Sequence, residues 1–372
     1  MQKLNPLFVS LLLLGGINLI TPSVTLGATE PLLLAQAAQN NNQNLNREVN
    51  ELLRQGREFV DAGDYANAIQ VYLQAANLDG ENARIFSGIG FLQATQQNFE
   101  AAVNAFQQAT ALEPENADFQ YALGYALANL GNNQAAAVAY RRAAQLDPEN
   151  LNAQIGLGVV LLRQEDYDGA LQVFQQVTSR DTRYWQAYES IGAALLQQGR
   201  IDEAVTALQQ AAALAPRQGS IQMILGVALL TQGNTNEALE TFQQAAQLEP
   251  RNAQLQLAIG QLLQDQGQMV EALVTYQRAA SLAPDLIEPQ AAIAAIHLQR
   301  QDYLQAIVAY RRLTELAPDN GDAYYNLALA LRGRERNLEA IEQLKKAQEL
   351  YQQQGENEGL EKVEALLSEL KP

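Results

Sequence analysis

The strongest constraint on the fold of this chain is a pattern that recurs every 34 residues without an insertion. Counted from Val49, nine repeats follow one another as far as Gln354, and they take up most of the 372 residues. Two positions of every repeat hold a small residue. The eighth holds Gly56, Gly90, Gly124, Gly158, Gly192, Gly226, Gly260, Ala294 and Ala328, and the twentieth holds Ala68, Ala102, Ala136, Ala170, Ala204, Ala238, Ala272, Ala306 and Ala340.

Each repeat reads as two amphipathic helices joined by a turn. In the sixth repeat, Leu225 and Leu229 belong to the first apolar stripe, and Leu239 and Phe242 to the second. One helix alone buries neither stripe, so consecutive repeats have to stack. The small residues predict places where two helix backbones approach closely, and the large residue at position 24 predicts a contact with the neighbouring pair.

The residues at the helix ends agree with this division. Proline at position 32 ends the second helix in most repeats, as at Pro114 and Pro250. Asn116 and Asn252 stand two residues later, where the N-cap of the next helix belongs. Glycine supplies the turn inside five repeats, for example at Gly131.

On these residues the chain resembles the tetratricopeptide repeat (TPR) family, whose period is also 34. The resemblance implies an all-α, right-handed superhelical solenoid of nine helix pairs over residues 49–354. Residues 355–372 read as one further amphipathic helix that caps the open end. We expect one elongated domain.

The N-terminal residues differ in composition from the repeats. Residues 1–37 are typical of an export signal: Lys3 precedes an uncharged, mostly apolar run, and cleavage sites fit after Ala28 or after Ala37. Alternatively, residues 6–28 stay as a membrane anchor. Residues 38–48, rich in Asn and Gln, read as a linker. We therefore expect a periplasmic protein, or one anchored to the membrane through its N-terminus.

The charge of the chain narrows the choice of partners. There are 24 basic and 41 acidic residues, a formal net charge of −17, so nucleic acid is not expected as a partner. The acids at the ends of the early repeats lie along one edge of the predicted stack, and we read them as solvated groups at helix ends rather than as a cation site. These are Asp79, Glu81, Glu113, Glu115, Asp147, Glu149 and Asp181.

The sequence offers little for catalysis. It contains no cysteine, and its one histidine, His297, stands where most repeats have leucine. The acidic group Glu165, Asp166 and Asp168 falls in a turn between helices, which favours a solvated turn over a metal site. No catalytic residue, metal or cofactor is expected, and the chain is predicted not to be an enzyme.

The TPR resemblance implies a concave groove, lined by the first helices, that binds a segment of a partner protein. Positions 2, 5, 9, 12 and 13 of a repeat usually face the ligand in that family. Carried onto this chain, they include Phe91, Tyr121, Tyr125, Ile155, Val159, Glu189, Met223, Val227, Leu257, Gln261 and Tyr325. Such a surface suits an amphipathic helix or an extended peptide that docks through apolar anchors.

One joint between repeats departs from the pattern. Thr182 replaces the proline, and Tyr184 and Trp185, the one tryptophan of the chain, follow it. Tryptophan is enriched at binding hot spots, so Trp185 is a candidate contact, and the joint is a candidate flexing site. Alternatively, Tyr184 and Trp185 fill the space that an altered turn leaves open.

Together these features predict a non-catalytic interaction scaffold. As an exported array of repeats without an enzyme domain, the chain is similar to the periplasmic TPR factors that assist photosystem II biogenesis in photosynthetic bacteria. This resemblance implies that the client is a membrane-protein subunit and that the protein associates with the membrane through this client. The alternative is a protein of envelope polysaccharide assembly that uses the same groove. That function needs aromatic residues in series, and Phe91, Tyr121 and Tyr125 are the candidates.

Overall fold

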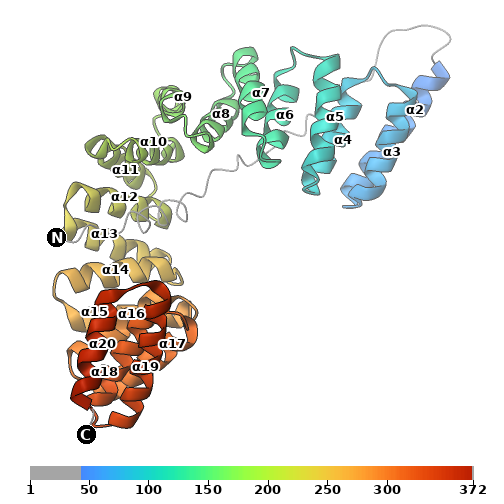
Figure 1. Ribbon diagram of the computed structural model, residues 1–372. Helices are drawn as coiled ribbons and strands as arrows, with labels where there is room; N and C mark the ends of the chain where they lie inside the picture. The colour runs from blue at the N-terminus through green and yellow to red at the C-terminus, as the bar shows by residue number, and fades with distance from the viewer. Residues whose placement is uncertain (1–42, 371–372) are drawn as a thin grey trace. The chain divides into compact units, whose positions relative to one another are not determined.

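The computed structural model describes residues 43–370, and this part of the chain folds into α-helices without a strand (Figure 1). The predicted signal segment and its anchor alternative lie outside the described residues. The first helices of the nine pairs are α2 (Gln43–Asp61), α4 (Ala83–Thr95), α6 (Ala117–Asn129), α8 (Leu151–Arg163), α10 (Trp185–Gln197), α12 (Gly219–Gln232), α14 (Ala253–Asp265), α16 (Ile287–Gln299) and α18 (Gly321–Arg332). The second helices are α3 (Tyr65–Leu78), α5 (Phe99–Leu112), α7 (Asn133–Leu146), α9 (Tyr167–Arg180), α11 (Ile201–Leu214), α13 (Thr235–Leu248), α15 (Met269–Leu282), α17 (Tyr303–Leu316) and α19 (Asn337–Gln354).

This element order confirms an all-α solenoid of nine helix pairs. The predicted capping helix is α20 (Asn357–Leu370), which packs on α19 through buried Val363 and Leu366. Among the described helices none is both long enough and apolar enough to cross a membrane.

The predicted linker is shorter than the composition suggested, because α2 already begins at Gln43. Val49 and Leu53, one turn apart, are buried and anchor this helix. Once those turns are formed, each added residue gains a backbone hydrogen bond, and Asn and Gln are only mildly unfavourable in helices. The polar tract therefore extends the first helix over residues 43–48.

The described residues form two compact bodies, 43–216 and 217–370, which we call the N-terminal and the C-terminal body. The expectation of one domain is corrected here. A solenoid can divide at any joint because each repeat packs only on its neighbours. The division falls after Pro216, whereas the Thr182 joint lies inside the N-terminal body, where α9 packs against α10.

The small residues at positions 8 and 20 fill different roles from the backbone contact that we expected. A Cβ atom added at Gly124 would lie 2.8 Å from Cδ1 of Tyr140, the position-24 ring of the same repeat. At Gly158 the corresponding ring is that of Phe174, at 2.6 Å. The eighth residue is small because the large side chain at position 24 lies across it, and the position-20 alanines are fully buried beside that ring.

The same rings also reach the following repeat. Tyr140 lies over Gly156, at position 6 of the next repeat, where an added Cβ would come within 2.5 Å of its Cζ atom. The contact of position 24 with the neighbouring pair is therefore confirmed, and it ties α7 to α8.

The turns between the paired helices use two kinds of residue. Five have glycine with a positive φ, such as Gly131 at +86°. The equivalent residues in the other four repeats are Gln97, Glu165, Gln301 and Glu335, with φ from 59° to 61°. Side chains other than glycine adopt this left-handed conformation at a cost, so these four turns are strained.

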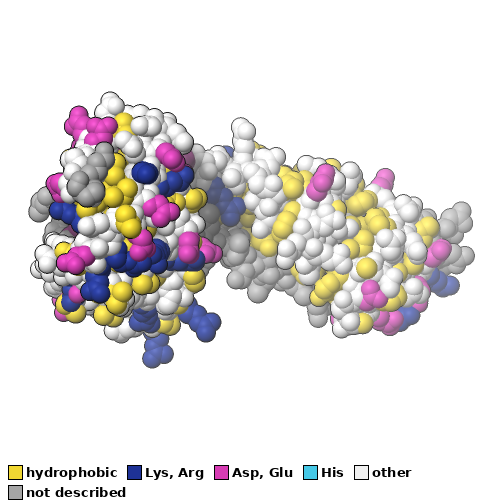
Figure 2. Space-filling view, turned by 60° about the horizontal axis from the view of Figure 1, so that its bottom comes forward, with side chains coloured by type: hydrophobic (Ala, Val, Ile, Leu, Met, Phe, Trp, Pro, Cys, Tyr) yellow, Lys and Arg dark blue, Asp and Glu magenta, His cyan; other side chains and the backbone are white. Residues whose placement is uncertain are grey.

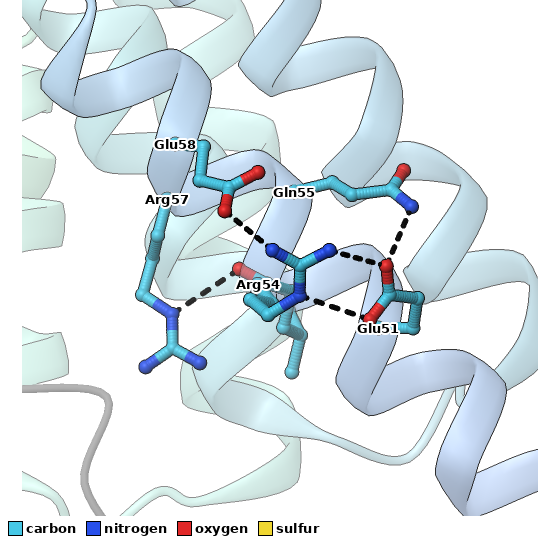
Figure 3. A network of polar contacts seen from close by, with 6 residues as sticks. Glu51, Arg54, Gln55, Arg57 and Glu58 are labelled. Atoms are coloured by element: carbon cyan, nitrogen blue, oxygen red, sulfur yellow. Dashed lines mark hydrogen bonds and ion pairs between the residues drawn. The ribbon is translucent and has the colours of Figure 1, made fainter.

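A polar network lies on α2, at the start of the solenoid (Figure 3). The Arg54 guanidinium donates to the carboxylates of Glu51 and Glu58, and Gln55 donates to Glu51 over 3.0 Å. The hydrogen bonds from Arg54 lower the pKa of Glu51 to about 2. These pairs are three or four residues apart on one helix, a spacing at which side-chain contacts stabilise the helix. They therefore stabilise α2, which has a neighbouring repeat on one side only.

Candidate partner-binding surface

The first helices form the inner face of each body. In the N-terminal body α4 contacts α6, α6 contacts α8 and α8 contacts α10, in addition to the second helices between them; in the C-terminal body α16 contacts α18. The second helices stand behind them and form the outer face. The predicted binding residues fall on the inner faces of two separate bodies, seven on the first and five on the second.

Phe91 on α4, Tyr125 on α6 and Trp185 on α10 are the half-exposed aromatic residues among the predictions for the N-terminal body, and the first two lie on neighbouring first helices. Phe99, the first residue of α5, meets Tyr125 edge to face, with ring centroids 6.3 Å apart. Asn129 donates to the Tyr125 carbonyl over 2.9 Å. We call Phe91, Phe99 and Tyr125 the aromatic patch, a partly exposed apolar surface held by packing on three consecutive helices.

Tyr121 lies one turn before Tyr125 but points into the core. Its ring centroid is 5.8 Å from that of Tyr140, and its hydroxyl is buried without a hydrogen-bond partner. Burial raises the pKa of Tyr121 to about 12. Tyr121 is therefore part of the hydrophobic core, and its predicted contact with a partner would require this side chain to become exposed.

Ile155 and Val159 on α8 are buried, at 1% and 3% exposure, within the same hydrophobic cluster as Tyr121. The structure therefore places them in the packing between repeats. Their part in partner binding stays a prediction, and any contact would require these side chains to become exposed.

At the Thr182 joint, Tyr184 precedes α10 without a side-chain cap and packs half-buried on the core cluster. Trp185 is half-exposed at the first position of α10, and Glu189, one turn later, is buried. Asp181 accepts a hydrogen bond from the Arg183 amide over 2.9 Å, which closes the turn without proline. Tyr184 fits the repacked joint, and Trp185 is partly exposed, so its role as a contact stays a prediction.

The C-terminal body contains the remaining predicted residues. Met223 and Val227 on α12 and Leu257 on α14 are buried. Gln261 is half-exposed and accepts from the Tyr276 hydroxyl at 3.3 Å. Tyr325 on α18 is half-exposed. The two halves of the prediction therefore differ, because aromatic side chains stay accessible mainly in the N-terminal body.

The candidate catalytic groups have structural roles in the described residues. His297 on α16 is nearly buried, and its Nδ1 lies 3.6 Å from the Asp302 carboxylate. Asp166 caps α9 by accepting from the Gly169 amide at 3.0 Å, and Asp168 accepts from Gln198 at 2.8 Å. Within residues 43–370 no cluster of His, Asp or Glu has the geometry of a metal site.

The acidic residues at the repeat ends stabilise turns. Glu113 accepts from the Asn116 side chain over 2.9 Å, and Asn116 in turn caps α6 by accepting from two backbone amides. Asp79 accepts from Asn82 over 3.0 Å in the same way, but Asn82 itself caps no amide, unlike the other Asn residues at this position. These contacts agree with the interpretation of the acids as groups at helix ends.

Sequence reasoning missed Phe99, because position 17 is not among the groove positions of the family. An aromatic residue directly after the Asn98 cap is the signal that could have identified it. Gln120 and Gln154, at position 4, were also missed; each donates to the carbonyl of the proline six residues earlier over 3.2 Å.

The fold and this surface define a class: all-α repeat proteins whose helix pairs expose an inner face. The tetratricopeptide repeat family model matches residues 90–150, 130–188, 155–221, 190–248 and 292–355, and two further models of such repeats match residues 56–97 and 229–296. The chain belongs to the tetratricopeptide repeat family, and it is a protein-interaction scaffold.

Several solved structures are similar to this chain, and one of them shares its fold over two thirds of the residues. A tetratricopeptide repeat protein from Parabacteroides merdae is 17% identical and covers 67% of this chain and 99% of its own, with a TM-score of 0.51. MamA from Desulfovibrio magneticus RS-1 is 25% identical over 46% of this chain and 96% of its own, with a TM-score of 0.44. YrrB, described as a TPR protein with an unusual peptide-binding site, is 21% identical over 50% and 95%, with a TM-score of 0.44. No curated protein matches the chain.

Proposed function

We propose that this protein is a non-catalytic scaffold that captures an apolar segment of a partner protein at the aromatic patch of its N-terminal body. One observation carries this proposal: Phe91, Phe99 and Tyr125 form a partly exposed aromatic surface on α4, α5 and α6. Aromatic rings present large apolar area with few rotatable bonds, so they lose little entropy when a partner docks.

The client that we propose is a subunit of a membrane complex, with a photosystem II reaction-centre subunit as the example that the resemblance in plan implies. An amphipathic or extended segment of such a subunit supplies apolar side chains to the patch. The net charge of −17 favours clients without a strongly acidic segment and makes association dependent on salt.

We also propose that the protein acts in the periplasm. Support comes from the apolar run after Lys3 and the two candidate cleavage sites. Cell fractionation combined with N-terminal sequencing tests this. A mature chain that starts at Thr29 or Ala38 in the periplasmic fraction supports export with cleavage, and recovery of the intact chain in the membrane supports the anchor.

The binding experiment is affinity capture from a detergent-solubilised membrane fraction of the source organism, followed by mass spectrometry. The full chain is compared with a Phe91→Ala/Tyr125→Ala variant. Tyr167→Ala is the control for the loss of a half-exposed aromatic residue elsewhere in the N-terminal body, because Tyr167 on α9 is exposed to a similar degree but lies outside the aromatic patch. We expect a membrane-protein client that the wild type and the control retain and the double variant loses.

Equal capture by the double variant would place the binding site elsewhere, with Trp185 as the next candidate. Capture of soluble proteins alone would contradict the proposed client class. For the alternative in polysaccharide assembly, burial of Tyr121 removes the middle member of the aromatic series that the sequence offered.

A further inference from the structure

Three consecutive leucines stand in the chain between the predicted export signal and α2. They are Leu32, Leu33 and Leu34, which we call the leucine segment, and they lie outside the described residues. The apolar run typical of export ends at residue 20, so the signal does not account for them. They remain on the protein if the signal is cut after Ala28, and also if residues 6–28 stay as an anchor. Three large apolar side chains in a row are unfavourable in water, which indicates that a surface covers them.

The aromatic patch lies in the same body as the helix that follows this segment. Phe91 packs on a hydrophobic cluster together with Phe59 and Val60 of α2. It also packs on the larger cluster of this body, as Phe99 and Tyr125 do. An apolar surface of partly exposed residues therefore continues from the last turn of α2 to the patch.

The chain between the leucine segment and α2 is long enough to reach the patch. Gln43, the first residue of α2, follows Leu34 by nine residues, and an extended chain spans at most about 3.3–3.6 Å per residue, or about 30 Å here. Arg57, at the repeat position of Phe91, follows Gln43 by 14 residues, a rise of about 21 Å along the helix. Packed helices lie about 8–10 Å apart, so Phe91 and Tyr125, on the next two first helices, lie about 25–30 Å from the start of α2.

The composition of the segment agrees with that of the surface. Residues 31–46 contain no charged side chain, so docking takes no charge out of water. On the face shown in Figure 2, the N-terminal body, at the right of the view, presents hydrophobic side chains between mostly uncharged ones. A segment on a short tether is also held at an effective concentration in the millimolar range, so weak apolar contacts are enough to keep it bound. A free acidic segment, by contrast, is repelled by the net charge of −17.

We propose that the leucine segment docks on the aromatic patch of its own chain and occupies it until a client displaces the segment. This inference rests on the proposed function, because it assigns a regulation to the same site. A client then meets only the fraction of molecules whose patch is open, and its apparent affinity falls by that fraction. Capture is thereby restricted to client segments that offer more apolar area than three leucines.

Crosslinking between two introduced cysteines tests this in the full chain, which contains no cysteine of its own. Leu33→Cys leaves the outer two leucines in place. Thr95→Cys puts the second thiol beside the patch, since Thr95 is exposed and its hydroxyl donates to the Phe91 carbonyl one turn earlier over 2.9 Å. Asn104→Cys is the matched control, at an exposed residue on α5, the second helix of the same repeat. After treatment with a short bis-maleimide at low protein concentration, we expect at least about ten-fold more internal crosslink with Thr95→Cys than with the control.

Two further variants show which residues make the contact. Leu32→Ser/Leu34→Ser changes no residue of a described helix, and it should reduce the crosslink at Thr95→Cys to the level of the control. Phe91→Ala/Tyr125→Ala should have the same effect from the side of the patch.

Several results would overturn the inference. Equal crosslinking at the patch and at the control position would do so, and so would a crosslink that survives the serine substitutions. A crosslinked dimer in place of the internal product would assign the patch to the leucine segment of a second copy. A mature chain that begins at Ala38 would lack the segment altogether.

The proposed function fails in a different experiment. Affinity capture that does not depend on Phe91 and Tyr125 refutes it, whether or not the internal crosslink forms. If both proposals hold, Leu32→Ser/Leu34→Ser should capture at least about two-fold more client than the wild type, because more molecules have an open patch. An unchanged yield of client would contradict the regulation.

Discussion

The contact between Tyr140 and Gly156 yields the sharpest prediction for the fold, that Gly156→Ala destabilises the N-terminal body. The added methyl group would lie 2.5 Å from Cζ and 2.6 Å from Cε1 of Tyr140. The ring cannot move away, because Tyr140 is only 1% exposed and its other side lies against Gly124. Either the ring or the α8 backbone must therefore shift.

Two effects of opposite sign set the size of this change. Overpacking a filled core costs about 1–3 kcal/mol. Alanine in place of glycine inside a helix stabilises by roughly 0.5–1 kcal/mol. The overpacking cost is the larger, so we expect a net loss of about 0.5–2 kcal/mol in the free energy of unfolding.

Gly88 supplies a matched control. It occupies the same repeat position on α4 and faces the ring of Tyr72, but there an added Cβ would be 3.8 Å from the nearest ring atom, which is an ordinary contact. Gly88→Ala keeps the helix gain without the overpacking, so it should stabilise by roughly 0.5–1 kcal/mol. The two substitutions are chemically identical, yet they should act with opposite signs.

Urea unfolding measures both variants. Far-UV circular dichroism follows the helices, and fluorescence of Trp185 reports on the N-terminal body alone, since this is the one tryptophan of the chain. A Gly156→Ala midpoint equal to or above that of Gly88→Ala would refute the reasoning from the Tyr140 contact. A Tyr140→Leu/Gly156→Ala double variant should lose less stability than the sum of its single variants, since the smaller side chain leaves room for the methyl group.

Three further predictions concern strain and buried polar groups. Glu165→Gly should raise the free energy of unfolding of the N-terminal body by about 1 kcal/mol, because Glu165 has φ of 61°, while Gly131→Ala should lower it; the shift of the urea midpoint measures both. Tyr121→Phe removes a buried hydroxyl without a partner and should stabilise by up to about 1 kcal/mol. Burial raises the pKa of Tyr121 to about 12, so between pH 10 and pH 12 the folded state keeps a proton that the unfolded chain loses. The stability of the wild type should therefore fall as the pH rises from 10 to 12. The stability of Tyr121→Phe should fall less over the same range. His297→Leu removes a buried Nδ1 atom that lacks a hydrogen bond, so it should raise the thermal unfolding midpoint of the C-terminal body. A lower midpoint would show instead that the contact between His297 and Asp302 stabilises this body.

The fold was predictable from the sequence because its signals repeat. Alanine at position 20 and a large residue at position 24 each occur nine times in register, so chance agreement is excluded and every pair could be placed. The division after Pro216 was not predictable, since each joint is local and the residues there match the repeat pattern.

The candidate site was only partly predictable. The groove positions implied by the TPR resemblance include Phe91 and Tyr125, which are half-exposed on first helices, but they also include Ile155 and Met223, which are buried. Position in a repeat defines the side of the helix that a residue occupies, whereas exposure depends on the sizes of its neighbours in adjacent repeats. Phe99 was not predicted because its contact with Tyr125 joins helices of two different repeats and does not recur at the same positions in the other repeats.

The match between position 24 and position 6 of the following repeat has a consequence for the history of the chain. In the N-terminal body, Tyr72 and Tyr140 are followed by glycine at that place, and Phe106 and Phe174 by Ala122 and Ser190. The repeats therefore resemble one another without being interchangeable. If the repeat that follows Tyr140 were exchanged for one with alanine or serine at position 6, the added Cβ would overlap the ring, as it would at Gly156, whereas Tyr72 leaves room for a methyl group at Gly88. The fit at the joint after Tyr140 therefore constrains which repeat can follow it.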